Sequence, residues 1–258
     1  FTTGAQEMTG TGFTEACGEY AAGTTVTYSG PVTLSQATSI TGTTVTFNDT
    51  LDSSATSGTT DGDTLGMTGN AVFKGLVGNT AELGSLSVSG TTALNGDGTT
   101  MSVSTTGDQT YSNTVTLGAN TTLNVTGLDA QAISMGSNTL TINESGTAAG
   151  SDAGTIAGTI SGTGALTMTG SGELTLAGTN TYLADTTVDA GRLIVTGSVN
   201  DAVRVVVNSG ATYQVGSTDT IGSIEGQGDI ALGAGFTLTT GGLGTDTINF
   251  ARAGAQVT

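Results

Sequence analysis

The sequence predicts an all-β protein of the solenoid class, in which short strands stack coil upon coil along a rod. Three observations lead to this prediction. Apolar residues recur at every second position within short runs. Turns rich in Gly, Asn and Asp separate these runs. Large side chains are scarce, since aromatic residues make up 4% of the 258 residues and Trp is absent. Small apolar residues spread thinly along the chain suit a long, narrow core rather than a central one.

The alternating runs place two apolar residues on either side of a polar one, which is typical of a strand with one face inward. Thr, being β-branched, suits the outward face of such strands. With roughly 20–25 residues per coil, the chain makes on the order of ten to twelve coils, or a rod of about 50–60 Å. The predicted strands are residues 24–28, 44–47, 86–88, 115–117, 123–125, 140–142, 166–168, 174–176, 193–195, 203–207 and 236–238.

A few segments depart from this pattern. Residues 14–22 favour two helical turns, with Thr14 as the N-cap, and residues 128–135 are a second candidate helix. Residues 51–64 predict a polar excursion from the solenoid. We therefore divide the chain into an N-terminal cap or exchanged segment, 1–22, and a β-solenoid, 23–258.

The charge balance limits which classes of partner the chain can bind. Asp and Glu number 21 against four cations, so the net charge is −17. The four cations are Lys74, Arg192, Arg204 and Arg252, which are too scattered to form the basic patch that nucleic acid or an anionic membrane requires. No run of about 18 apolar residues predicts a membrane span. We therefore expect neither nucleic-acid binding nor direct membrane insertion.

Residues 162–195 resemble the passenger-associated repeat of bacterial autotransporters. The family pattern is Gly-x-Gly-x-Leu-x-Leu, then Gly-x-Asn-x-Tyr, then Thr-x-Val-x-x-Gly-x-Leu. In this sequence it is met by Gly172, Leu174, Leu176, Gly178, Asn180, Tyr182, Thr186 or Thr187, Val188, Gly191 and Leu193. The Gly that usually follows the Asn-x-Tyr element is replaced by Leu183-Ala184-Asp185. Residues 107–127 are similar to the Gln-x-Tyr coils of large secreted adhesins of the same broad group.

This resemblance implies a right-handed parallel β-helix that is secreted and displayed on or outside a bacterium, as a released passenger or a free-standing subunit. Nothing in the sequence resembles the translocator barrel of autotransporters. The first residue is Phe1 rather than Met, which is typical of a processed chain whose targeting segment has been removed. Resemblance at the level of the fold supports architecture and location better than activity.

The residue types argue against catalysis. The sequence has no His, which excludes Ser-His-Asp and Cys-His arrangements and His-based zinc sites. Cys17 therefore has no His to activate it as a nucleophile, and we interpret it as a buried thiol or an intermolecular contact. Paired carboxylates, such as those of polysaccharide-active β-helix enzymes, stay open as an alternative. The candidate pairs are Asp49 with Asp52, Asp61 with Asp63, and Asp201 with Asp219.

Other motifs have simpler interpretations. Asp61-Gly62-Asp63 resembles part of a calcium loop without the remaining ligands, so we expect no cofactor, with calcium between acidic turns as an alternative. Gly162-Thr163-Gly164 is interpreted as a turn rather than a phosphate loop. Tyr111 and Tyr182 are interpreted as coil-packing residues, and Thr ladders as ordinary outward positions rather than an ice-binding surface. Asn-x-Ser/Thr sequons occur at Asn48, Asn120, Asn124 and Asn143.

These observations favour a mechanical function, as a self-assembling fibre or surface-stalk subunit rather than an enzyme. A solenoid has open strand edges at both ends, which invite head-to-tail association. Residues 247–258 are strand-like without an evident cap, so Phe1, Cys17 and Phe250 are the candidate intermolecular contacts. The alternatives are a monomeric adhesin that binds glycans or a host surface, and a polysaccharide-active enzyme.

Overall fold

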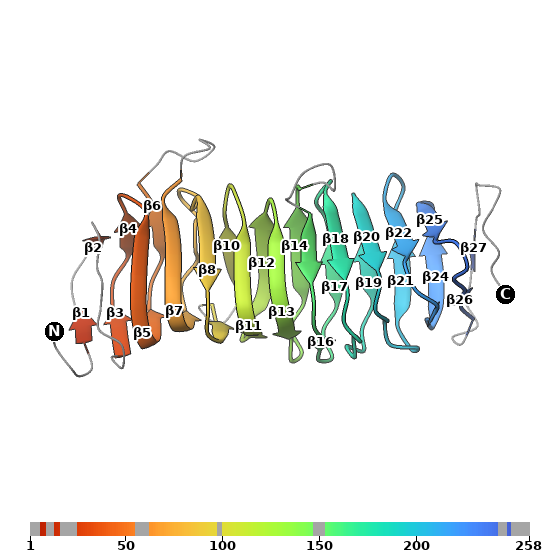
Figure 1. The fold of residues 1–258 in the computed structure, drawn as a ribbon, viewed down its shortest axis with the longest axis horizontal. Helices are drawn as coiled ribbons and strands as arrows, with labels where there is room; N and C mark the ends of the chain where they lie inside the picture. Colours follow the sequence, from red (N-terminus) through yellow and green to blue (C-terminus); the bar gives the residue numbers. More distant parts are fainter. Residues whose placement is uncertain are drawn as a thin grey trace.

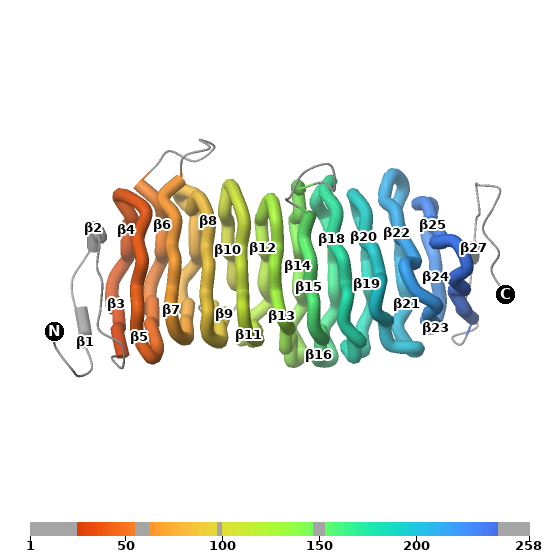
Figure 2. Tube along the Cα trace, in the orientation of Figure 1, coloured from red at the N-terminus to blue at the C-terminus, as the bar shows by residue number. Residues whose placement is uncertain are grey.

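The chain folds into a rod of stacked coils, a parallel β-helix of about ten turns (Figure 1). This computed structural model describes residues 25–54, 62–96, 100–146 and 153–241, and the backbone of the strand residues 6–8, 13–15 and 247–248. No helix occurs in the described part, and so none that could cross a membrane. The tube in Figure 2 shows the coils following one another along the rod in sequence order.

Two long parallel sheets form the main walls of the rod, and we name them sheet A and sheet B. Sheet A contains β1 (Gln6–Met8), β3 (Thr25–Tyr28), β5 (Thr38–Phe47), β7 (Thr64–Phe73), β8 (Ser85–Val88), β9 (Thr92–Leu94), β11 (Gln109–Leu117), β13 (Leu128–Ser134), β15 (Gly154–Ile156), β16 (Ile160–Ser161), β18 (Glu173–Leu176), β20 (Arg192–Val195), β22 (Thr212–Val215) and β25 (Asp229–Leu232).

Sheet B contains β10 (Thr100–Ser104), β12 (Asn120–Val125), β14 (Leu140–Glu144), β17 (Leu166–Met168), β19 (Thr186–Val188), β21 (Arg204–Val207), β24 (Ser223–Gly226) and β27 (Thr247–Ile248). Three earlier strands, β2 (Phe13–Glu15), β4 (Val32–Leu34) and β6 (Leu51–Ser53), continue this wall toward the N-terminus through bridges from Leu51 to Val77 and from Val77 to Val103. A short pair, β23 (Asp219–Thr220) with β26 (Leu238–Thr239), lies at a corner near the C-terminal end.

The coil is 19–20 residues long over much of the rod, as from Leu174 to Leu193 and from Leu193 to Tyr213. Some steps differ, such as the 23 residues from Leu86 to Gln109, and two of the longest contain insertions, residues 55–61 and 147–152, between a sheet-B-side strand and the next sheet-A strand. Consequently Val45 pairs with Ala71, and Ile142 pairs with Met168, each 26 residues further on. Both insertions fall at the same corner of the cross-section, between β6 and β7 and between β14 and β15.

The core is a set of side-chain columns that run along the rod. Inward residues of sheet B pair in register as Val103, Leu123, Ile142, Met168, Val188 and Val207, all of which are at most 1% exposed. Near the N-terminal end, sheet A stacks the rings of Tyr28, Phe47 and Phe73, with centroids 4.9 and 5.4 Å apart and nearly parallel planes. The alternation seen in the sequence thus becomes a narrow core filled coil by coil.

Several sequence-based assignments are corrected. Residues 128–134 form strand β13 instead of a helix, with Leu128, Ala130 and Ile133 inward and Met135 in the following turn. The first residues of the other candidate helix, Thr14 and Glu15, belong to strand β2, and residues 16–22 lie outside the described part. The predicted excursion 51–64 is shorter, since β6 occupies Leu51–Ser53 and β7 begins at Thr64.

Two further corrections concern Phe236 and the threonines. Phe236 lies outside β26, which begins at Leu238, and its side chain is 40% exposed. Thr is not confined to outward positions, because Thr92, Thr121 and Thr186 occupy inward columns and are buried. The Thr121 hydroxyl donates to the Ala119 carbonyl at 2.9 Å, whereas the buried Thr92 hydroxyl has no hydrogen-bond partner among the described residues.

Candidate functional sites along the solenoid

The carboxylates of the candidate pair Asp49 and Asp52 accept hydrogen bonds from two different turns. Asp49 lies in a turn, where its Oδ1 accepts a hydrogen bond from the Thr50 amide at 2.8 Å. Asp52 reaches across to the next coil, and its Oδ1 accepts from the amides of Thr80 and Ala81 at 2.8 and 3.4 Å. Both carboxylates therefore stabilise turns, which is a structural role for short acidic side chains.

Asp63 closes the base of the first insertion. Its Oδ2 accepts hydrogen bonds from the Ser53 hydroxyl at 2.9 Å and from the Ser54 amide at 3.2 Å, and its own amide donates to the Ser53 hydroxyl at 2.9 Å. These bonds join the end of β6 to the start of β7. The predicted partner of Asp63, Asp61, lies outside the described residues.

Asp219 and Asp201 are the pair that the structure does bring together. Asp219 is buried at a corner of the coil, and its Oδ2 accepts a hydrogen bond from the Val199 amide at 2.9 Å. Burial raises the pKa of Asp219 and the nearby charge of Asp201 raises it further, while the Val199 and Thr220 amides lower it. Asp201 itself is exposed. One carboxylate is thus buried and bonded to the backbone and the other is solvated, a division that suits structure better than a shared catalytic task.

A shallow recess of about 470 Å³ lies on the outer side of this corner. Its wall combines hydroxyl, amide and carboxylate groups with apolar surface, so a ligand there would meet both hydrogen-bonding groups and apolar contacts. The residues that line it are Thr179, Asn180, Thr181, Ser198, Val199, Asn200, Asp201 and Ala202.

The two tyrosines interpreted as packing residues are buried in the core, which confirms that interpretation. The Tyr111 hydroxyl donates to Oε1 of Gln109 at 3.0 Å. Gln109 is also fully buried, and its Nε2 donates to the carbonyls of Val103 and Asn124 at 3.1 and 3.0 Å. The Tyr182 hydroxyl bonds the Thr186 hydroxyl. The polar groups of Tyr111, Gln109 and Tyr182 thus each meet a partner inside the rod.

Glu144 is a buried charged residue that the sequence analysis did not identify. It ends β14 at an inward position and is completely inaccessible to solvent. Its Oε2 accepts a hydrogen bond from the Leu128 amide at 3.1 Å, and its Oε1 accepts one from the Gly146 amide at 3.0 Å. Burial raises its pKa to about 7 against the opposing effect of these amides, and the charge of Asp108 adds to the rise.

A signal for Glu144 was present in the sequence. The run Leu140-Thr-Ile142 alternates inward and outward, and continuing it by two residues places Glu144 inward. An acidic residue at an inward position of a strand predicts a buried carboxylate with specific partners.

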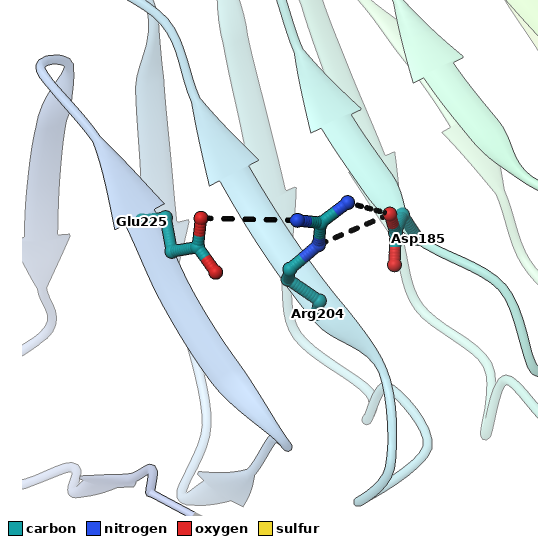
Figure 3. A network of polar contacts seen from close by, with 3 residues as sticks. All are labelled: Asp185, Arg204 and Glu225. Atoms are coloured by element: carbon teal, nitrogen blue, oxygen red, sulfur yellow. Dashed lines mark hydrogen bonds and ion pairs between the residues drawn. The ribbon is translucent and has the colours of Figure 1, made fainter. Parts of the chain in front are cut away.

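The outer face of sheet B carries ladders of polar side chains. Figure 3 shows Arg204 of β21 between Asp185, which precedes β19, and Glu225 of β24. The Arg204 Nε donates to Asp185 Oδ2 at 3.1 Å, and its Nη1 lies 3.8 Å from Glu225 Oε2. Hydrogen bonding and the charge of Asp185 raise the pKa of Arg204. On sheet A, Arg192 pairs with Glu173 across one coil step at 3.1 Å.

Further along sheet B, Asn and Thr form the ladders. Asn143 Nδ2 donates to Asn124 Oδ1 at 3.1 Å, and Asn124 Nδ2 donates to the Ser104 hydroxyl at 2.9 Å. A single column of Thr122, Thr141, Thr167 and Thr187 runs beside them in register. Of the sequon residues, Asn48, Asn120 and Asn143 are exposed, and Asn124 is half-buried in this ladder.

The last described coil of sheet A is less well covered than the coils before it. Ile230 and Leu232 of β25 are only partly buried, whereas Tyr213 and Val215, one coil earlier, are at most 1% exposed. Phe236 follows in the same coil and is 40% exposed. The predicted contacts Phe1, Cys17 and Phe250 lie outside the described residues.

The described side chains contain no group of three or more His, Cys, Asp or Glu residues placed to hold a metal ion. Comparison of the chain with protein-family models, with curated proteins and with solved structures finds no match.

Proposed function

We propose that the chain is an extracellular structural protein of a bacterium, a fibre or surface-stalk subunit that assembles head-to-tail through the ends of its solenoid. The observation that carries this proposal is the last described coil of sheet A, where Ile230, Leu232 and Phe236 leave apolar surface accessible. A parallel strand added to β25 would cover that surface and extend the sheet. A second copy would supply such a strand in the same direction.

The rest of the rod is consistent with a mechanical role. Its core columns are continuous and its outer faces carry polar ladders, so length and stiffness come from repetition of one coil. The resemblance of residues 162–195 to the autotransporter passenger repeat supports an extracellular location. The described carboxylates of the candidate pairs engage turn amides or solvent, which favours a structural protein over an enzyme.

Negative-stain electron microscopy of the purified chain tests this proposal. We expect filaments of uniform width from the full chain and none after deletion of residues 1–22. Phe236→Asp, which places a charge on the last described coil, should also abolish them. Leu183→Asp is the matched control, because Leu183 is 56% exposed on the flank of the rod and its substitution should leave filaments intact.

The second candidate function is a monomeric adhesin that binds glycans from the side of the rod. The recess at residues 179–181 and 198–202 favours it, because its hydroxyl, amide and carboxylate groups can bond sugar hydroxyls and its apolar surface can contact the sugar ring. Isolated rods from the full chain at every salt concentration tested would contradict self-assembly. Binding of such rods to a glycan array would then support the adhesin.

A further inference from the structure

The recess arises because two neighbouring coils take different paths between the same pair of anchors. One anchor is the bridge between Thr179 and Ser198, and the other is the pairing of Thr186 with Val205, in each case 19 residues apart. Between these anchors the second coil forms a tight turn at residues 200–203, closed by a backbone hydrogen bond of 2.9 Å. The turn departs from the path of the first coil and leaves the recess between the two.

Four polar side chains in the wall of the recess have hydrogen-bonding groups that the protein leaves unused. Within the described part of the chain, the hydroxyls of Thr179, Thr181 and Ser198 form no hydrogen bond with another residue. Asn200 Oδ1 accepts from the Ala202 amide at 2.9 Å, which leaves Nδ2 of Asn200 as a donor for a ligand. Each hydroxyl can both donate and accept, so the wall suits a ligand that carries several hydroxyl groups.

Asp201 gives the recess its charge. It is the one charged residue among those that line the recess, and its exposed carboxylate forms no ion pair or hydrogen bond with the other described residues. The nearest cation along the chain, Arg204, lies between Asp185 and Glu225 (Figure 3). The net charge of −17 on the whole chain also attracts cations to its surface. The recess therefore favours a positively charged ligand over an anionic one.

We propose that the recess binds an amino sugar, with the ammonium group on the Asp201 carboxylate and the ring hydroxyls on the hydroxyl and amide groups around it. An ionised carboxylate only accepts hydrogen bonds and an ammonium group only donates them, so the two are complementary. A neutral sugar leaves the charge of Asp201 unused, and a Lys side chain brings no hydroxyls to the wall. The apolar part of the wall contacts the C–H groups of the ring. The inference rests on the second candidate function, glycan binding at this recess, and is independent of filament formation.

Fluorescence anisotropy of end-labelled oligosaccharides measures this preference in filaments and in isolated rods alike. The probes are the β-1,4-linked tetramers of glucosamine, N-acetylglucosamine and glucose, which share one backbone and differ at carbon 2 of each ring. At pH 6 and 50 mM NaCl we expect the glucosamine tetramer to bind about 5-fold more tightly than the other two. This advantage should shrink at 500 mM NaCl, because salt screens the charge of the carboxylate. Labelled tetralysine, which has four ammonium groups and no hydroxyls, should bind more weakly than the glucosamine tetramer.

Two variants locate the interaction. Asp201→Asn should weaken binding of the glucosamine tetramer about 3- to 5-fold and leave the affinity for the glucose tetramer unchanged. Asp129→Asn is the matched control, because Asp129 is also exposed but lies on β13, so it removes the same charge away from the recess. Equal losses in the two variants, or tetralysine binding as tightly as the glucosamine tetramer, would indicate attraction to the rod as a whole and overturn the proposal.

The glucose tetramer separates the choice of ligand from glycan binding itself. If it bound as tightly as the glucosamine tetramer, and Asp201→Asn changed neither affinity, the recess would remain a glycan site and the assignment of an amino sugar would be wrong. If none of the three tetrasaccharides bound, both the assignment and the second candidate function would fall.

Discussion

At the scale of single residues, the corner occupied by Ile160, Asn180, Val199 and Asp219 shows how one position can be filled in two ways. Asn180 Oδ1 accepts from the Ile160 amide, and its Nδ2 donates to the carbonyls of Gly178 and Ser198 at 3.0 and 2.9 Å. Asp219 makes the corresponding bond to the Val199 amide at 2.9 Å. An ionised carboxylate, however, has no hydrogen to donate. Asn thus satisfies the site at all pH values, and Asp satisfies it fully only when protonated.

Asp219→Asn should therefore stabilise the protein at neutral pH. The raised pKa of Asp219 means that its contribution to stability is complete below its unfolded pKa, near 3.9, and is lost as the pH rises through the folded value. We expect a gain of about 1 kcal/mol at pH 7.5 and little change at pH 3.5. Urea unfolding followed by circular dichroism at the two pH values measures the difference.

Asp201→Asn is the control for that substitution. Asp201 acts on Asp219 only through its charge and is itself exposed, so its substitution should produce a smaller gain in the same direction. If Asp219→Asn proved destabilising at pH 7.5, the comparison with Asn180 would be wrong.

At the scale of elements, the strands differ in what fills the same column. β3, β5 and β7 place Tyr28, Phe47 and Phe73 at one inward position, whereas β9 and β11 continue it with Leu94 and Leu117. The three rings stack with interplanar angles of 4° and 6°. Offset ring stacking adds to the apolar area that is buried. The N-terminal coils therefore contain a column of stacked rings, whereas the buried Tyr111, Tyr182 and Tyr213 lie in later coils.

Phe47→Ala should be strongly destabilising, because it leaves a cavity between two rings. We expect a loss of about 3–5 kcal/mol in the free energy of unfolding. Phe47→Leu keeps most of the volume and imitates the Leu94 of a later coil, so its cost should be about 1 kcal/mol. Denaturant unfolding of the wild type, Phe47→Ala and Phe47→Leu under the same conditions measures the difference. Equal losses of unfolding free energy in Phe47→Ala and Phe47→Leu would contradict the claim that the side-chain volume filling this column stabilises the rod.

Strand β13 shows where the alternation of apolar and polar residues fails to predict which residues face inward. Residues 128–134 have inward residues at 128, 130 and 133, a spacing that alternation alone does not produce. A register shift between β11 and β13, at Tyr111 and Thr114, accounts for the break. Such a shift is a property of two strands together, so one strand's sequence does not reveal it.

At the scale of the whole molecule, charge opposes compactness. A net charge of −17 is carried by a rod whose neighbouring coils lie about 4.8 Å apart. Arg204 offsets part of this repulsion by lying between Asp185 and Glu225 on adjacent coils. The remaining excess of negative charge is screened only by salt.

Raising the NaCl concentration from 20 to 500 mM should consequently raise the Tm by a few degrees. The increase should be larger in Arg204→Ala, because Asp185 and Glu225 are then left without their cation. Thermal melts followed by circular dichroism test both statements. A Tm that falls with salt in the wild type would show that ion pairs outweigh repulsion.

The sequence by itself determined the class of fold: alternation of apolar residues predicted the strands, the scarcity of aromatics predicted a narrow core, and the turn residues predicted coils. Alternation is visible locally because each residue's face follows from that of its neighbour. The coil length of 19–20 residues, the position of the two insertions and the partners of Glu144, Asn180 and Asp219 were decided only by the tertiary structure. Each of these depends on contacts between residues about one coil apart, and no local pattern encodes which of them meet.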